Sequence, residues 1–154
     1  MTAQSDIYDD IKEIIQSGDY SEYAPNGINV FYDYERSVPF PIKINEYPVV
    51  VITEIERSAN MQSKGEVRNR RHGYQIDVYS NDRQVEQEDG TLTTEDGHKI
   101  TRGIGLIIDD LLTKHWFTNV GSPNNHIANV DPTIARYCMR FTVYVDSDNI
   151  INRR

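Results

Sequence analysis

The order of three patterned segments restricts the fold more than any other feature of this chain. Apolar residues alternate with polar ones from Tyr74 to Ser80 and again from Ala135 to Val145, and between them apolar residues recur every three to four positions from Lys99 to His115. Alternation predicts half-buried strands, and the longer period predicts a helix with one apolar face. A strand, a helix and a strand in this order predict one α+β unit whose helix packs on the sheet.

Further segments complete the expected architecture. An N-terminal helix is expected, with Ser5 or Asp6 as its cap and Gly18 as its stop, because isoleucines recur there on one face. Strands are expected from Ile28 to Tyr34 and from Tyr47 to Ile55, the second buried on both faces. The expected fold is therefore α+β: a mostly antiparallel sheet of about four to five strands with two helices packed on it, in the order α-β-β-β-α-β.

We expect a single domain over residues 1–154, with three segments that stand outside its core. The polar segment at about 57–72 is either a loop or a protruding hairpin arm. The acidic segment at about 81–98 is expected to be a loop, with an extra hairpin as the alternative because it contains two Asp-Gly turn signals. The tail at 147–154 is expected to be flexible and either solvent-exposed or bound to a partner.

Composition argues against several classes of protein. The chain carries 24 acidic and 16 basic residues, a net charge of −8, whereas a general nucleic-acid binder needs a basic surface. A negative wall would instead leave a DNA duplex mobile. The single cysteine, Cys138, allows no internal disulfide and no cysteine zinc site. The sequence contains neither a signal peptide nor an apolar run of membrane-spanning length, so we expect synthesis in a cytoplasm and no membrane contact.

No group of residues has the pattern of a catalytic centre. Glu54, Glu56 and Asp77 fall on predicted neighbouring strands and would suit a divalent metal, as in a metal-dependent nuclease. The lysine of the common nuclease pattern is missing, which favours a solvated sheet face or an ion pair between subunits. The four histidines match no zinc motif, and the chain has no phosphate-binding loop and no serine elbow. We expect no enzyme activity, no cofactor and no metal.

Two charged segments indicate contact between copies of the chain. A basic cluster near residues 64–71 and an acidic segment after Ser80 give one subunit patches of opposite sign. Such patches favour head-to-tail contacts, which form a ring when they close. The candidate interface residues are Lys64, Arg68, Arg70, Arg71, Glu86, Glu88, Asp89, Glu95 and Asp96.

Tyrosines form a second possible contact set. Ten tyrosines outnumber four phenylalanines, and tyrosine is enriched at protein interfaces. Tyr20, Tyr23, Tyr32 and Tyr34 fall in or near predicted loops, where both binding and ordinary packing remain open interpretations.

The layout from about residue 5 to 146 resembles the tail-terminator (tail-completion) proteins of long-tailed bacteriophages. The resemblance rests on Tyr47–Ile52, a polar arm, Ile76–Ser80, a helix that ends at the aromatic pair Trp116-Phe117, and Arg140–Val143. It implies a structural virion protein, usually a hexameric ring, that caps the head-proximal end of the tail tube and stops tube polymerisation. The long acidic insert after Ser80 departs from the simplest form of this pattern, and leaves open which surface lines the lumen.

The resemblance also implies a set of partners. These are copies of the chain itself, the major tail tube protein and the head connector or neck proteins, with DNA passing through the lumen without specific binding. The arm would order against the tube or a neighbouring subunit, and the acidic segment would face the channel or the connector. Three alternatives remain: another neck or head-completion protein, a small monomeric binding domain of a toxin-system or stress protein, and, more distantly, the metal-dependent nuclease.

Overall fold

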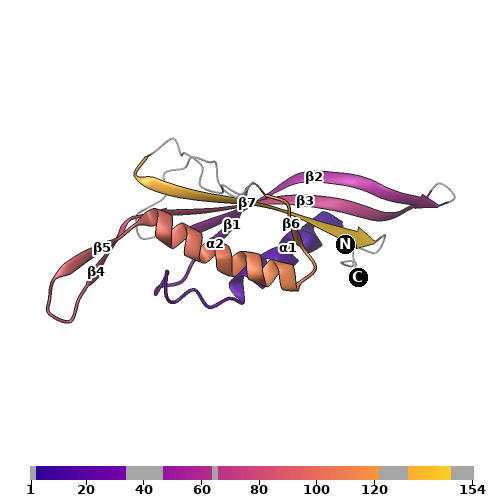
Figure 1. The fold of residues 1–154 in the computed structure, drawn as a ribbon. Helices are drawn as coiled ribbons and strands as arrows, with labels where there is room; N and C mark the ends of the chain where they lie inside the picture. The colour runs from indigo at the N-terminus through magenta and orange to yellow at the C-terminus, as the bar shows by residue number, and fades with distance from the viewer. Residues whose placement is uncertain (1–2, 34–46, 64–65, 122–131, 147–154) are drawn as a thin grey trace.

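Two helices and seven strands make up the described part of the chain. The computed structural model describes residues 3–33, 47–63, 66–121 and 132–146, of which 3–6, 56–63, 66–70 and 146 are described by their backbone alone (Figure 1). The elements are α1 (Ala3–Gln16), β1 (Asn29–Tyr32), β2 (Val49–Ser63), β3 (Glu66–Asn81), β4 (Arg83–Glu86), β5 (Leu92–Glu95), α2 (Gly97–Lys114), β6 (Thr118–Asn119) and β7 (Ile134–Asp146).

The sheet confirms the α+β class and corrects one detail of its topology. Five strands lie in the order β1-β2-β3-β7-β6, and β4 and β5 form a separate two-stranded sheet. Every neighbouring pair is antiparallel except β1 and β2, which are parallel, so the main sheet is mixed. The connection between β1 and β2 spans residues 33–48, which is long enough for the crossover that parallel pairing requires.

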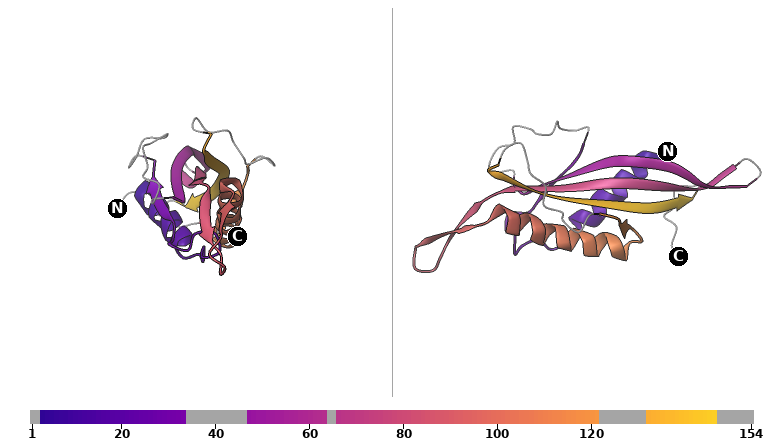
Figure 2. Two further views of the ribbon diagram at one scale, coloured as in Figure 1. Left: turned by 90° about the vertical axis from the view of Figure 1, so that its left-hand side faces the viewer. Right: turned by 45° about the horizontal axis from the view of Figure 1, so that its top comes forward.

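Both helices cover the same face of the sheet (Figures 1 and 2). The apolar stripe of α1 is fully buried at Ile7, Ile11 and Ile15, as its spacing predicts. Ile100, Ile104, Ile108 and Leu112 of α2 are likewise buried. They meet the inward residues of β2, β3 and β7 in one continuous core. Within the described residues, neither helix is both long enough and apolar enough to cross a membrane.

The helix boundaries differ slightly from those expected. The first helix begins at Ala3, so Ser5 and Asp6 lie inside it rather than capping it, and it ends two residues before Gly18. The second begins at Gly97 instead of Lys99, because the Asp96 carboxylate accepts a 3.0 Å hydrogen bond from the backbone N–H of His98 and caps the helix.

The other face of the sheet carries no helix among the described residues. Val49, Val51 and Tyr79 form a small second apolar cluster there, with Phe31, Tyr47 and Ile134 packed against it. Val49 to Ile52 are all buried, which confirms that this part of β2 is covered on both faces. Farther along, this face becomes polar, and Ile55 is 47% exposed.

Two hairpins extend from opposite ends of the sheet (Figures 1 and 2). At one end β2 and β3 run beyond β7, whose pairing with β3 stops at Asn69 and Asp146. The segment at 57–72 is therefore a hairpin arm rather than a loop. At the other end β4 pairs with β5 from Arg83 opposite Glu95 to Glu86 opposite Leu92, so the hairpin alternative is also correct for the acidic segment.

Candidate functional site

The acidic hairpin (residues 82–96) is stabilised by its own side chains. Six of its residues are acidic and one, Arg83, is basic. At the turn, Asp89 Oδ1 accepts hydrogen bonds from the backbone N–H of Thr91 at 3.0 Å and from its hydroxyl at 2.6 Å. These bonds lower the pKa of Asp89 and keep the carboxylate ionised. The hairpin thus holds a folded, negatively charged shape that extends into solvent.

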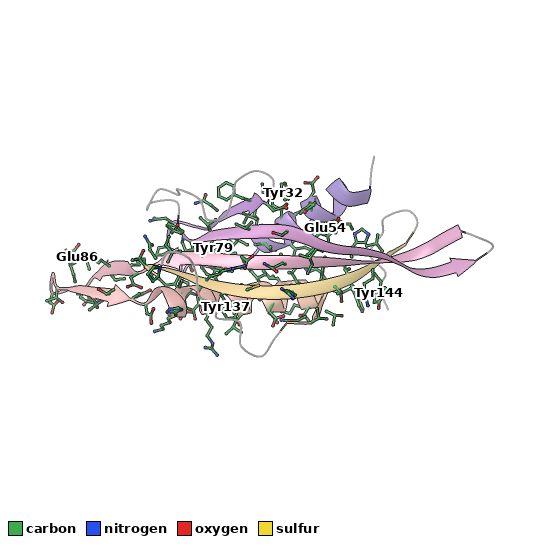
Figure 3. The ribbon with its side chains drawn as sticks, turned by 90° about the horizontal axis from the view of Figure 1, so that it is seen from above. Tyr32, Glu54, Tyr79, Glu86, Tyr137 and Tyr144 are labelled. Atoms are coloured by element: carbon green, nitrogen blue, oxygen red, sulfur yellow. The ribbon has the colours of Figure 1, made fainter. Side chains whose placement is uncertain are left out.

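Arg83 ties the base of this hairpin to the rest of the molecule. Its Nη1 donates a 2.8 Å hydrogen bond to the carbonyl of Tyr23, and its Nη2 pairs with Glu95. Because Glu95 pairs with Arg83 and Asp96 caps α2, these two candidate interface residues have roles within the chain. Glu86 and Glu88 are exposed and form no ion pair with a described residue (Glu86 is labelled in Figure 3). They remain the best contact candidates in the hairpin.

The basic arm (residues 57–72) lies at the opposite end. It contains five basic residues and one acidic residue. Lys64 lies outside the described residues, and Arg68 and Arg70 are placed by their backbone, with Arg70 paired to Val145. Arg71 is half-buried and pairs with Tyr144 in the register of β3 and β7. The structure therefore brings the basic candidates to one end and the acidic candidates to the other.

The helix-free face carries a chain of polar contacts across β3 and β7. Asp77, only 3% exposed, accepts a 2.8 Å hydrogen bond from Arg136 Nε and a 2.9 Å bond from the Gln75 amide. Arg140 Nε lies 3.3 Å from Gln75 Oε1, and the Arg136 guanidinium lies 5.8 Å from the centre of the Tyr79 ring. These side-chain contacts join β3 to β7, and they leave Asp77 bonded to partners within its own chain.

The same register argues against the nuclease alternative. Glu54 pairs with Tyr74, and Asp77 pairs with Val51, in an unbroken stretch of the β2–β3 ladder. Because successive residues of a strand alternate between faces, Glu54 and Asp77 lie on opposite faces of the sheet. The two residues do lie on neighbouring strands, as expected, but because they lie on opposite faces the two carboxylates cannot share one metal. The side chain of Glu56 lies outside the described set.

Glu54 belongs instead to a buried polar network under α1 that sequence analysis missed. Tyr74 donates a 3.2 Å hydrogen bond to its Oε2, and the ring Nδ1 of fully buried His72 lies 3.2 Å from the Tyr74 hydroxyl. The Tyr8 hydroxyl accepts from the Glu54 backbone N–H at 2.9 Å and donates to Asp33 at 3.2 Å. The network links α1 to the sheet, and no local sequence motif would reveal it.

The tyrosines near loops divide between packing and exposure. Tyr20 is buried, with its hydroxyl bonded to the Ile15 carbonyl, and Tyr32 is buried, with its hydroxyl bonded to Asp9. For these two, packing is the correct interpretation. Tyr23 is half-buried, and Tyr34 lies outside the described residues.

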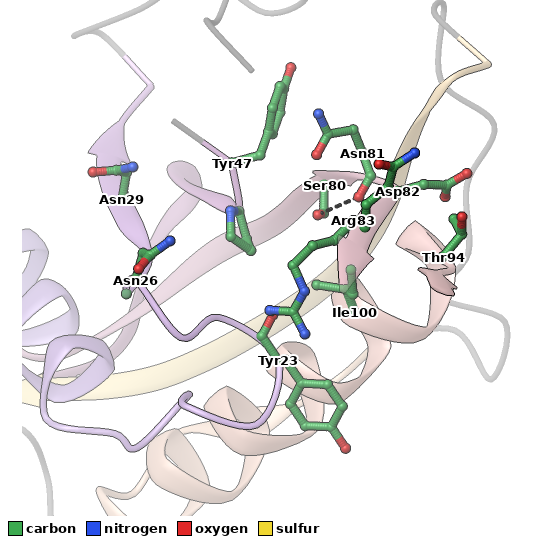
Figure 4. Close-up of a pocket in the computed structure, with 13 residues that line it drawn as sticks. Tyr23, Asn26, Asn29, Tyr47, Ser80, Asn81, Asp82, Arg83, Thr94 and Ile100 are labelled. Carbon is green, nitrogen blue, oxygen red and sulfur yellow. Dashed lines mark hydrogen bonds between the residues drawn. The ribbon is translucent and has the colours of Figure 1, made fainter. Parts of the chain in front are cut away.

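A polar cleft of about 690 Å³ opens at the base of the acidic hairpin (Figure 4). Asn26 and Asn29 border one side, and Asp82 and Thr94 the other, with Arg83 between them. The complete lining consists mainly of amides and hydroxyls: Tyr23, Asn26, Gly27, Asn29, Tyr47, Pro48, Ser80, Asn81, Asp82, Arg83, Gln84, Thr94 and Ile100. These residues come from five separate parts of the chain, so sequence spacing gave no signal for the cleft.

No protein-family model matches the chain, and no curated protein matches it. The charges, hairpins and cleft described above therefore carry the functional interpretation.

Proposed function

We propose that this chain is a structural subunit of a ring that caps the head-proximal end of a long-tailed phage tail tube, stops tube growth and offers a docking surface to the head. One observation carries this proposal: hairpins of opposite charge extend from opposite ends of an elongated subunit (Figure 1). A five-stranded sheet covered by two helices on one face explains the stability of the body. It does not explain two long polar extensions, which a neighbouring copy would use.

The placement of charge favours contacts between copies over contacts within one copy. The acidic hairpin and the basic arm lie too far apart along the sheet to meet in one subunit (Figure 2). Opposite surfaces on opposite ends make a head-to-tail contact, and repetition of that contact around an axis closes a ring. The likeness to tail-terminator proteins supplies the choice of a hexamer and of the tail tube as the template.

Imaging tests the proposal directly. Negative-stain images of the purified protein, alone and mixed with tail tubes, should contain a six-fold annulus with a hole wide enough for a DNA duplex. A protein that remains solitary in both samples would contradict the ring and favour the small monomeric binding domain. Parallel mixing with tailless heads separates a tail terminator from another neck component, since the two differ in the particle that they bind first.

Charge reversal tests the contact. Arg70→Glu with Arg71→Glu should abolish assembly, as should Glu86→Lys with Glu88→Lys, because each makes like charges face each other. A mixture of the two double variants should recover mixed assemblies. The matched control is Lys99→Glu with Arg102→Glu, which reverses two exposed charges on α2. Circular dichroism melting must establish that each variant folds. Assembly of the arm variant at the wild-type concentration would remove the arm from the interface.

A further inference from the structure

The polar cleft at the base of the acidic hairpin has the properties of a preformed peptide-binding site. Arg83 fixes its wall by bonding to the Tyr23 carbonyl on one side and to Glu95 on the other. The Gly97 backbone N–H donates a 2.8 Å bond to Asp82 Oδ1, which holds the opposite rim. A site held by such contacts needs little reordering when a ligand enters.

The lining identifies the chemical class of the ligand. A volume of about 690 Å³ is within the range of ligand pockets, but those usually have apolar walls. Here the side chains of Asn26, Asn81 and Gln84 present amide donors and acceptors. Amides pair well with the backbone N–H and C=O groups along the edge of a β-strand or hairpin.

Charge around the cleft selects a basic peptide. Asp82 stands on the rim, and the strand that rises from it carries exposed Glu86. The acidic hairpin as a whole has six acidic residues against one arginine. An anionic ligand would therefore be repelled, and a cationic one attracted over the distance of a Debye length, about 8 Å at physiological salt.

The chain's own basic arm matches these requirements. Its segment from Asn60 to Arg71 combines neutral polar residues with four basic ones. It lies at the far end of the sheet from the cleft, so it can reach only the cleft of another copy (Figure 1). We infer that the cleft of one subunit receives the basic arm of the next. The inference rests on the proposed ring and specifies its contact.

Cysteine crosslinking in trans tests the inference. One protein carries Ser63→Cys at the end of β2, and a second carries Thr94→Cys on the cleft wall. Their mixture should form a disulfide-linked heterodimer on non-reducing gels, whereas either protein alone should not form that species. The native thiol, Cys138, is buried and will not interfere. The matched control replaces Thr94→Cys with Thr113→Cys on the exposed side of α2, and this mixture should not crosslink.

A cleft-filling variant gives a second, independent measurement. Thr94→Trp should raise the concentration needed for assembly by about tenfold or more, as expected when a contact of central importance is blocked. Thr93→Trp, on the same exposed strand but outside the cleft lining, should leave assembly unchanged.

The outcomes separate the inference from the function on which it rests. Six-fold rings without crosslinking between residues 63 and 94, and with normal assembly of Thr94→Trp, would overturn the arm–cleft contact and keep the ring. Crosslinking of Thr94→Cys to a cysteine placed at residue 154 instead would assign the cleft to the C-terminal tail and overturn the inference as well. A protein that stays solitary even with tail tubes would overturn the ring itself.

Discussion

Arg136 Nε donates a 2.8 Å hydrogen bond to Asp77 Oδ1 and so joins β7 to β3 on the helix-free face of the sheet. The two residues are diagonal neighbours, because Arg136 pairs with Tyr79 and Asp77 pairs with Cys138. The side chain of Asp77 is 5% exposed and that of Arg136 is 24% exposed. The carboxylate thus depends on its partner for the contacts that water would otherwise supply.

Loss of that partner should destabilise the fold. Arg136→Ala leaves the Asp77 carboxylate buried with one fewer donor, and we expect the free energy of unfolding to fall by about 2 kcal/mol, less than for a fully buried pair because water reaches the arginine. Urea denaturation measures the change. Arg140→Ala is the control on the same strand, since Arg140 is exposed and should cost no more than about 0.5 kcal/mol. A loss below about 0.5 kcal/mol for Arg136→Ala, no larger than that for an exposed residue, would mean that the ion pair contributes nothing.

The Tyr8 hydroxyl should contribute to the attachment of α1. Tyr8→Phe removes the acceptor of the Glu54 backbone N–H and the donor to Asp33, and we expect a loss of about 1–2 kcal/mol in the free energy of unfolding. Tyr23→Phe is the matched control, expected within about 0.5 kcal/mol, because no hydrogen bond of the Tyr23 hydroxyl occurs among the described residues. An unchanged urea midpoint for Tyr8→Phe would exclude the polar network as a source of stability.

Alkaline pH should weaken the fold through buried tyrosines. Burial raises the pKa of Tyr8 from 10.0 to about 12, and burial raises the pKa of Tyr20 and of Tyr79 further. Above pH 10 the unfolded chain releases these protons while the folded chain keeps them, so stability present below pH 10 is lost as the pH rises toward 12. Absorbance at about 295 nm should detect a late-ionising class of tyrosines. Ionisation of all tyrosines near pH 10 would contradict this burial.

Two glycines of α2 should tolerate alanine unequally. A Cβ at Gly105 would lie 2.5 Å from ring atoms of Tyr137 on β7, and one at Gly103 would lie 2.3 Å from the ring of Tyr23. Tyr137 is held in the core, whereas the end of the half-buried Tyr23 ring can move. We expect Gly105→Ala to lower the free energy of unfolding by about 1–3 kcal/mol, after the gain of about 1 kcal/mol in helix propensity that either substitution brings. Gly103→Ala should lower it less, because the Tyr23 ring can move aside. Urea denaturation of both variants decides the order.

The single thiol should be unreactive in the native protein. Cys138 is 6% exposed, and burial first, with Asp77 adding to it, raises the pKa of its thiol to about 12. Because the thiolate is the reactive form, a thiol reagent at pH 8 should modify Cys138 only after the protein unfolds. The measurement is the reaction with a chromogenic disulfide reagent with and without urea. Prompt modification in buffer alone would place the thiol at an accessible surface.

Periodicity alone was enough to predict most of the elements. The stripes of α1 and α2 and the alternation of β7 are properties of neighbouring residues in the chain, and burial of Ile7, Ile104 and Phe141 follows from them. The direction of β1 and the short pairing of β6 with β7 were not predictable in this way. Both features depend on the path of the connecting segments between strands, and the local sequence pattern does not specify that path.

The sequence predicted the charge of the two candidate segments, and the structure revealed their shape and their contacts within the chain. Counting residues located a basic segment and an acidic one, and both are hairpins at the ends of the sheet. Counting could not reveal that Glu95 and Asp96 already have partners within the chain, or that Arg83 closes one wall of a cleft. Hydrogen bonds between distant segments depend on tertiary packing, as the bond between Arg83 and Tyr23, 60 positions apart in the chain, illustrates.

The amino-acid sequence by itself determined the α+β class, the apolar faces of the helices and strands and the opposite charges of two segments, because these follow from composition and from periods of a few residues. Only the tertiary structure decided that Glu54 and Asp77 lie on opposite faces, and that the charged segments lie at opposite ends of the sheet. The physical reason is that strand register and packing set distances between residues that are far apart in the chain.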